Sequence, residues 1–156
     1  MLRKNSMWLL LSVLIIALDQ ASKYWAKAHL QFQQPYWLTS FFNLNLNFNA
    51  GAAFSFLSNE GGWQIHLFQG ISIIVSIILI VWLLLLGSKQ NLKALGLSLI
   101  IGGAIGNLID RIRLNYVVDF FDFHLKDWHF ATFNVADSAV CVGAFFLILS
   151  MIWQRD

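Results

Sequence analysis

Four long apolar stretches dominate this sequence and constrain what it can fold into. A membrane-spanning helix needs about 20 mostly apolar residues. Charged residues make up only 12% of the chain, against roughly 25% in soluble domains. The sequence therefore predicts an α-helical integral membrane protein, a four-transmembrane-helix bundle forming a single membrane domain over 1–156. The expected spans are at about 7–25, 65–87, 92–110 and 135–153.

The first span is the least clear of the four. Only the twelve-residue stretch from Met7 to Leu18 is predominantly apolar, so the helix reaches span length by continuing through Asp19 and Lys23. The alternative is a cleaved signal peptide with Arg3 and Lys4 as its basic end. No small-x-small cleavage site follows, and this favours a permanent span.

Lys and Arg in short flanking segments set the orientation of membrane helices. Placing both termini and the 87–93 turn in the cytoplasm divides these residues equally, five on each side. The cytoplasmic segments are much shorter, so their positive charge is denser, and the other side holds seven of the eight acids. We therefore expect cytoplasmic termini and outer loops at about 26–64 and 111–134.

The outer loops carry strand patterns. Apolar residues alternate with asparagine from Phe42 to Asn49, and this period of two predicts a strand with one apolar and one amide face. The segments 117–123 and 128–133 also have strand-like composition. We expect a small extracytoplasmic β-sheet on the outer membrane surface, with aromatic rings at headgroup depth.

Polar side chains gather at the outer ends of the helices, where ionisable groups are costly and usually functional. Asp19 and Lys23 are four residues apart, so they can pair on one helix face. Asp110 adjoins Arg111, which we expect to keep it ionised. A stripe of small residues leads to Asp110 and permits close helix packing: Ala94, Ser98, Gly102 and Gly106.

Asp119 and Asp137 differ from the other acids because apolar residues surround them and no cation is adjacent. If they meet, they would share a proton, since two close carboxylates cannot both ionise cheaply. Such a pair can activate water and polarise a carbonyl group. On the residues alone, a peptidase and a proton- or ion-coupled carrier are equally well supported. A non-enzymatic assembly factor that binds partner helices through the small-residue stripe is a third alternative.

Other polar residues carry no clear chemistry. Asp122, Asp127 and Glu60 are expected to be solvated, and no histidine is spaced to serve a nucleophile or a zinc ion. Cys141, the single cysteine, is interpreted as a small buried apolar group. The sequence thus predicts no metal site and no cofactor. The net charge of +2 gives no basic field to recruit nucleic acid.

Five short motifs, in order and spaced over most of the chain, resemble those of the lipoprotein signal peptidase family (signal peptidase II) of bacterial inner membranes. They are DQASK at Asp19, NAGAAF at Asn49, GGAIGNLIDR at Gly102, VVDF at Val117 and FNVADS at Phe133. The resemblance implies an intramembrane aspartic endopeptidase that cleaves diacylglyceryl-modified prolipoproteins just before the lipidated cysteine.

The resemblance also implies roles for individual residues. The two catalytic aspartates of the family fall on Asp119 and Asp137. The family resemblance further implies a monomer in the inner membrane that is inhibited by globomycin. The positions that line or support the site in the family correspond to Asn49, Gly51, Asn107, Arg111 and Asn134. Three further motif positions, which we interpret as structural, are Asp19, Lys23 and Asp110.

Overall fold

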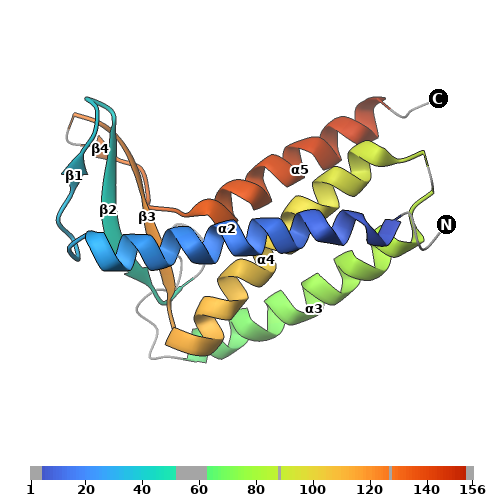
Figure 1. Ribbon diagram of the computed structural model, residues 1–156, viewed down its shortest axis with the longest axis horizontal. Coiled ribbons are helices and arrows are strands. Elements are labelled where there is room, and N and C mark those ends of the chain that lie inside the picture. Colours follow the sequence, from blue (N-terminus) through green and yellow to red (C-terminus); the bar gives the residue numbers. More distant parts are fainter. Residues whose placement is uncertain (1–4, 52–62, 88, 127, 154–156) are drawn as a thin grey trace.

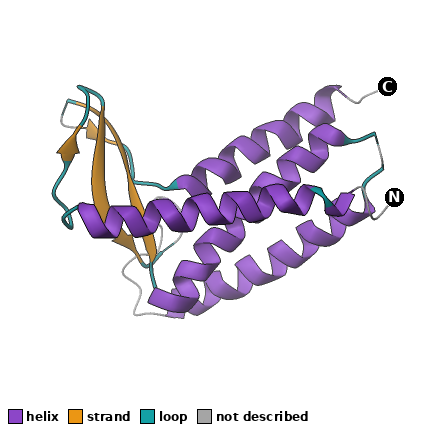
Figure 2. Cartoon of the chain, in the orientation of Figure 1, coloured by secondary structure: helices purple, strands orange, loops and turns teal. Residues whose placement is uncertain are grey.

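The computed structural model describes residues 5–51, 63–87, 89–126 and 128–153. Four long helices lie side by side and a small sheet lies at one end of them, while the start of α2 and the end of α5 lie at the other end (Figures 1 and 2). Each helix is long and apolar enough to cross a membrane, so the predicted architecture is confirmed. The helices are α2 (Trp8–His29), α3 (Trp63–Leu85), α4 (Asn91–Leu114) and α5 (Val135–Trp153).

Two helices extend further on the sheet side than the apolar pattern predicts. Helix α2 continues past residue 25 to His29, because Ala26 is buried against Leu46 and Val118 of the sheet. Helix α4 continues past residue 110 and stops only where Asn115 adopts a left-handed conformation with φ 63°. This conformation is a common helix end, and it turns the chain into the next strand.

The sheet has four antiparallel strands in the order β1-β2-β3-β4. The segment 128–133, expected to be a strand throughout, forms only a two-residue strand, and Phe133 then makes a single bridge to Phe121. The short strand β1 was not predicted. The strands are β1 (Tyr36–Trp37), β2 (Phe42–Asn49), β3 (Val117–Leu125) and β4 (Trp128–His129).

The alternation along β2 is interrupted by a bulge. The register against β3 shifts between Leu44 and Asn47, so two residues of β2 oppose one of β3. Asn43 and Leu46 are consequently both buried although they are three positions apart. The expected division of this strand into one apolar and one amide face is therefore only approximate.

Helix α4 is the most buried of the four helices, and it contacts each of the other three. The predicted small-residue stripe faces α2. A Cβ added at Gly106 would lie 2.7 Å from an Asp19 oxygen, and Ser12 Oγ donates a hydrogen bond of 2.8 Å to the Ser98 carbonyl oxygen. The stripe thus delivers Asp110 into the interior, where it is 3% exposed.

A second small-residue surface of α4 faces α5. At Gly103 an added Cβ would overlap the carbonyl oxygen of Ala136 and lie 2.7 Å from Val140 Cγ2. Close backbone approach of this kind stabilises helix association in lipid, where burying apolar side chains between helices contributes little free energy. The contact fixes the N-terminal turn of α5 against α4.

We expect Gly103→Ala to lower the thermal unfolding midpoint of the detergent-solubilised protein, because overpacking costs about 1–3 kcal/mol. Gly70→Ala on α3 is the matched control, since an added Cβ there meets nothing within 4 Å. Equal midpoints for the two variants would contradict the close packing of α4 against α5.

Candidate active site

Asp119 and Asp137 are joined by two asparagines. Asn134 Nδ2 donates hydrogen bonds to Asp119 Oδ1 at 2.7 Å and to Asn107 Oδ1 at 3.1 Å. Asn107 Nδ2 in turn donates to Asp137 Oδ1 at 2.8 Å. Strand β3, helix α4 and the start of α5 thus bring the two predicted carboxyl groups into one network.

The first turn of α5 orients Asp137. Asn134 caps the helix by accepting a hydrogen bond from Asp137 N–H at 2.9 Å, and Asp137 Oδ2 accepts one from Asn134 N–H at 3.3 Å. This reciprocal arrangement is a capping box with Asp in place of the usual Glu. Asp19 of α2 accepts a further bond from Ala136 N–H at 2.9 Å. The carboxylates of Asp137 and Asp19 therefore both accept hydrogen bonds from backbone N–H groups at the positive, N-terminal end of α5.

A buried lysine connects α2 to α4 beneath this network. Lys23 Nζ lies 2.9 Å from both Asp19 Oδ2 and Asp110 Oδ2, and it donates to Asn107 Oδ1 at 2.8 Å. All three ammonium donors are thus used, which is what a buried amine requires. The predicted pairing of Asp19 with Lys23 is confirmed. Asp110 pairs with Lys23 instead of Arg111, because the Lys23 ammonium group on the neighbouring helix α2 lies 2.9 Å from the Asp110 carboxylate.

A second set of bonds connects Asp119 to the turn after β2. Asn49 Nδ2 donates to Asp119 Oδ2 at 3.2 Å, and Asn49 Oδ1 accepts a bond from Gly51 N–H at 2.9 Å. Arg111 Nη2 then donates to the Gly51 carbonyl oxygen at 3.1 Å. Asp119 is therefore held by one amide on each oxygen, from Asn49 and Asn134.

All ten residues singled out in the sequence belong to this connected region. Two glutamines that we did not single out also contribute. Gln20 Nε2 donates to Asp110 Oδ1 at 2.9 Å, and Gln69 Nε2 donates to the Arg111 carbonyl oxygen at 2.8 Å. Gln69 is a polar residue in the most apolar of the four helices, and this contrast in the sequence could have identified it as a candidate.

One expectation about the outer acids is wrong. Asp122 is only 1% exposed, and its carboxylate lies 2.9 Å from His129 Nδ1 and accepts a bond from Asn43 Nδ2 at 3.4 Å. It is buried because β3 continues through it to Leu125 instead of ending in a loop. His129 accordingly has a carboxylate partner that its sequence spacing did not reveal. Asp127 and Glu60 lie outside the described residues. The interpretation of Cys141 as a buried group is also wrong, because its side chain is exposed on α5.

Within the described ranges, no group of three or more His, Cys, Asp or Glu side chains is arranged to hold a metal ion.

The dominant electrostatic effect outside the spans concerns Asp119. Burial, with Asp137 nearby as a second cause, raises the pKa of the Asp119 carboxyl from 3.8 to about 7. Its position near neutrality suits a group that exchanges protons with a substrate.

The fold and this site define a multi-pass membrane protein with a pair of hydrogen-bonded carboxyl groups, one buried and one partly buried, at one end of its helix bundle. Its similarity to known proteins is extensive. Lipoprotein signal peptidase of Coxiella burnetii (strain Dugway 5J108-111) is 60% identical over 145 residues, 93% of this chain and 89% of the relative. That of Hydrogenovibrio crunogenus is 46% identical over 93% of this chain and 84% of the relative. A solved bacterial membrane enzyme superposes with a TM-score of 0.85 at 28% identity, covering 97% of this chain and 90% of that chain.

The model of the signal peptidase (SPase) II family matches residues 11–153. The chain therefore belongs to the signal peptidase II family, and it is a membrane peptidase.

The raised pKa of Asp119 gives a prediction for stability. Burial penalises the charged carboxylate, so the folded protein holds this proton more tightly than the unfolded chain. The resulting stabilisation is complete below the unfolded pKa of 3.8 and is lost as pH rises through the folded pKa of about 7. We expect the unfolding midpoint of the wild type to fall relative to that of Asp119→Asn between about pH 5 and about pH 8. Parallel pH profiles for the two proteins would contradict this assignment.

Proposed function

We propose that this chain is an aspartic endopeptidase that removes the signal peptide from diacylglyceryl-modified prolipoproteins by cleaving before the lipidated cysteine. The observation that carries the proposal is a pair of carboxyl groups, Asp119 buried and Asp137 partly buried, connected through Asn134 and Asn107. Family membership supports the substrate class, since the matched relatives are lipoprotein signal peptidases.

The chemistry requires that the two carboxyl groups share one proton near neutral pH. The ionised member takes a proton from a water molecule, which attacks the scissile carbonyl carbon, while the protonated member donates to the carbonyl oxygen. The carboxyl group that took the proton from water then donates it to the leaving amine as the C–N bond breaks, and the hydroxyl of the tetrahedral intermediate returns its proton to the other carboxylate. The pair titrates as a unit, so the shared proton belongs to both groups. No metal or organic cofactor enters this mechanism.

The neighbouring polar residues support the pair. Asn107 and Asn134 hold the carboxylates by direct hydrogen bonds, and Asn49 holds Asp119 from the opposite side. Arg111 and Gly51 fix the turn that carries Asn49 into place. We assign these five residues to lining and supporting the site. Asp19, Lys23 and Asp110 we assign to structural support, because they join helices.

The location of the site suits a lipid-modified substrate. Asp119 belongs to β3 and Asp137 to the first turn of α5, so the carboxyl pair lies at the sheet end of the helix bundle. A membrane-spanning signal peptide beside the helices would place its acylated cysteine at that depth, with the acyl chains still in lipid. We propose a monomer in the bacterial inner membrane with both termini cytoplasmic, the site near the outer face, and inhibition by globomycin.

A proton- or ion-coupled carrier is the competing function. A carrier needs ionisable or polar groups along the whole path through the membrane. In the described part of the chain, the buried ionisable side chains all lie toward the sheet end, and buried polar residues such as Ser12 and Ser98 at the other end bond to backbone carbonyls. This distribution favours the peptidase.

We expect Asp119→Asn and Asp137→Asn each to reduce cleavage of a diacylglyceryl-modified prolipoprotein by a factor of about 10² to 10⁴, the usual contribution of general acid–base catalysis. The measurement is a gel-shift assay with purified protein. Asp156→Asn, at the last residue of the sequence, is the control for changing an acid elsewhere.

Near-normal turnover by either variant would rule out the carboxyl pair. Loss of wild-type activity in EDTA, restored by a divalent ion, would point instead to a metal-dependent peptidase.

Asp19→Asn tests the structural role of the lysine network. The substitution places an amide N–H₂ where Asp19 Oδ2 now accepts bonds from Lys23 and Gln20. We expect a loss of about 3–5 kcal/mol of stability, typical of breaking a buried ion pair, with cleavage persisting in the folded fraction. An Asp19→Asn protein that melts like the wild type and yet fails to cleave would place Asp19 in the chemistry.

A further inference from the structure

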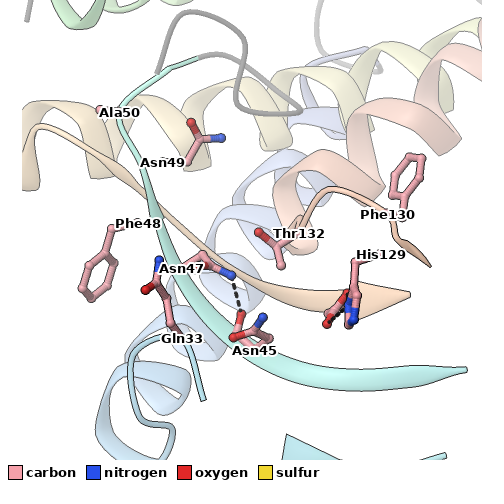
Figure 3. A pocket seen from close by; sticks show the side chains of 10 residues that line it. Gln33, Asn45, Asn47, Phe48, Asn49, Ala50, His129, Phe130 and Thr132 are labelled. Atoms are coloured by element: carbon pink, nitrogen blue, oxygen red, sulfur yellow. Dashed lines mark hydrogen bonds and ion pairs between the residues drawn. The ribbon is translucent and has the colours of Figure 1, made fainter. Parts of the chain in front are cut away.

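A polar pocket lies along β2, beginning at the proposed active site. It has a volume of about 420 Å³, within the range of small-ligand sites. Its lining runs from Asn49 and Ala50 at one end to His129 and Phe130 at the other (Figure 3). We call it the amide pocket after the four carboxamide side chains in its lining, which are those of Gln33, Asn45, Asn47 and Asn49. Its other polar lining residues are Asp122, His129 and Thr132.

Part of the hydrogen-bonding capacity of this pocket is unused, although Asn47, Asn49 and the His129–Asp122 pair already have partners. Among the residues that the structure describes, the side chains of Gln33 and Thr132 and the Nδ2 group of Asn45 have no hydrogen-bond partner. Asn45 Oδ1 is buried and likewise has no partner in the described chain. A buried acceptor without a donor is costly, so the pocket is suited to a ligand that brings both donors and acceptors.

The pocket is continuous with the proposed catalytic centre. Asn49 lines it and also donates a hydrogen bond of 3.2 Å to Asp119 Oδ2. A substrate whose scissile bond lies at Asp119 therefore has this pocket as an immediate neighbour. The bulge at Leu44–Asn47 places Asn45 within the lining, so the strand irregularity helps to build the pocket.

The chemistry of the pocket selects one part of the substrate. The signal peptide and the acyl chains are apolar, and burying them against carboxamides would leave polar groups unpaired. The segment after the lipidated cysteine has to leave the bilayer as an extended, solvated chain, with a free N–H and C=O at each residue. Carboxamides carry the same donor and acceptor groups as a peptide bond.

We propose that the amide pocket binds the polypeptide backbone immediately C-terminal to the lipidated cysteine. This inference rests on the proposed function and identifies the part of the substrate that the sheet recognises. Binding through the backbone tolerates different side chains, so one pocket serves substrates that differ in sequence beyond the cleavage site.

The test compares two synthetic diacylglyceryl peptides that share one signal sequence. The short peptide ends in an amide at the lipidated cysteine, and the long peptide carries several polar residues beyond it. We expect the wild type to cleave the long peptide with a kcat/KM on the order of tenfold higher, the effect of two or so added hydrogen bonds. N-methylation of the added residues should abolish this advantage, whereas scrambling their order should preserve it.

The variants are Asn45→Ala/Asn47→Ala and Thr132→Val, and the control is Gln34→Ala, an exposed amide outside the pocket. The pocket variants should lose the advantage of the long peptide through a higher KM while cleaving the short peptide normally, which also shows that they fold. The inference is overturned if the wild type has no length preference or if the pocket variants cleave both peptides equally less well. Failure of the wild type to cleave either peptide would instead overturn the proposed function, and this inference with it.

Discussion

The buried ammonium group of Lys23 is the interaction on which the rest of the structure depends. It lies 2% exposed between α2 and α4, and all its donors are taken by Asp19, Asp110 and Asn107. Each of these acceptors also makes a second contact. Asp19 caps α5, Asp110 accepts a bond from a backbone N–H of β3, and Asn107 holds Asp137. One cation thus coordinates the helices and the strand that carry the proposed catalytic pair, and its own burial is tolerable only because these partners are complete.

Close packing around α4 makes this arrangement possible. Small residues face α2 on one side and α5 on the other, so both helices approach α4 nearly backbone to backbone. Long side chains at these positions would hold the helices apart, so that Asn107 could no longer form its hydrogen bond with Asp137. In lipid, where apolar burial gives little preference for one packing over another, small residues and polar bonds specify the structure together.

Much of the architecture follows from the sequence, because hydropathy identifies spans and polar residues at span ends identify the site. Asp119 and Asp137 could be predicted as site residues, because their apolar neighbours and the absence of an adjacent cation can be read from the flanking sequence. The partner of Asp110 was not visible, because Lys23 is distant in sequence and Arg111 is adjacent. The burial of Asp122 was missed for a similar reason: its partners, His129 and Asn43, are brought to it by strand pairing. The bulge in β2 could not be predicted, because apolar residues and asparagines alternate without interruption through that strand.

The capping of α5 by Asp19 has a consequence for biosynthesis. The acid belongs to the first described helix and the N–H group that it accepts from belongs to the last. A chain emerging from the ribosome therefore carries Asp19 and Lys23 into the membrane long before Asp137 exists to be oriented. The proposed hydrolytic centre is incomplete until α5 has been translated and has docked, so the proposed activity would begin only with the finished bundle.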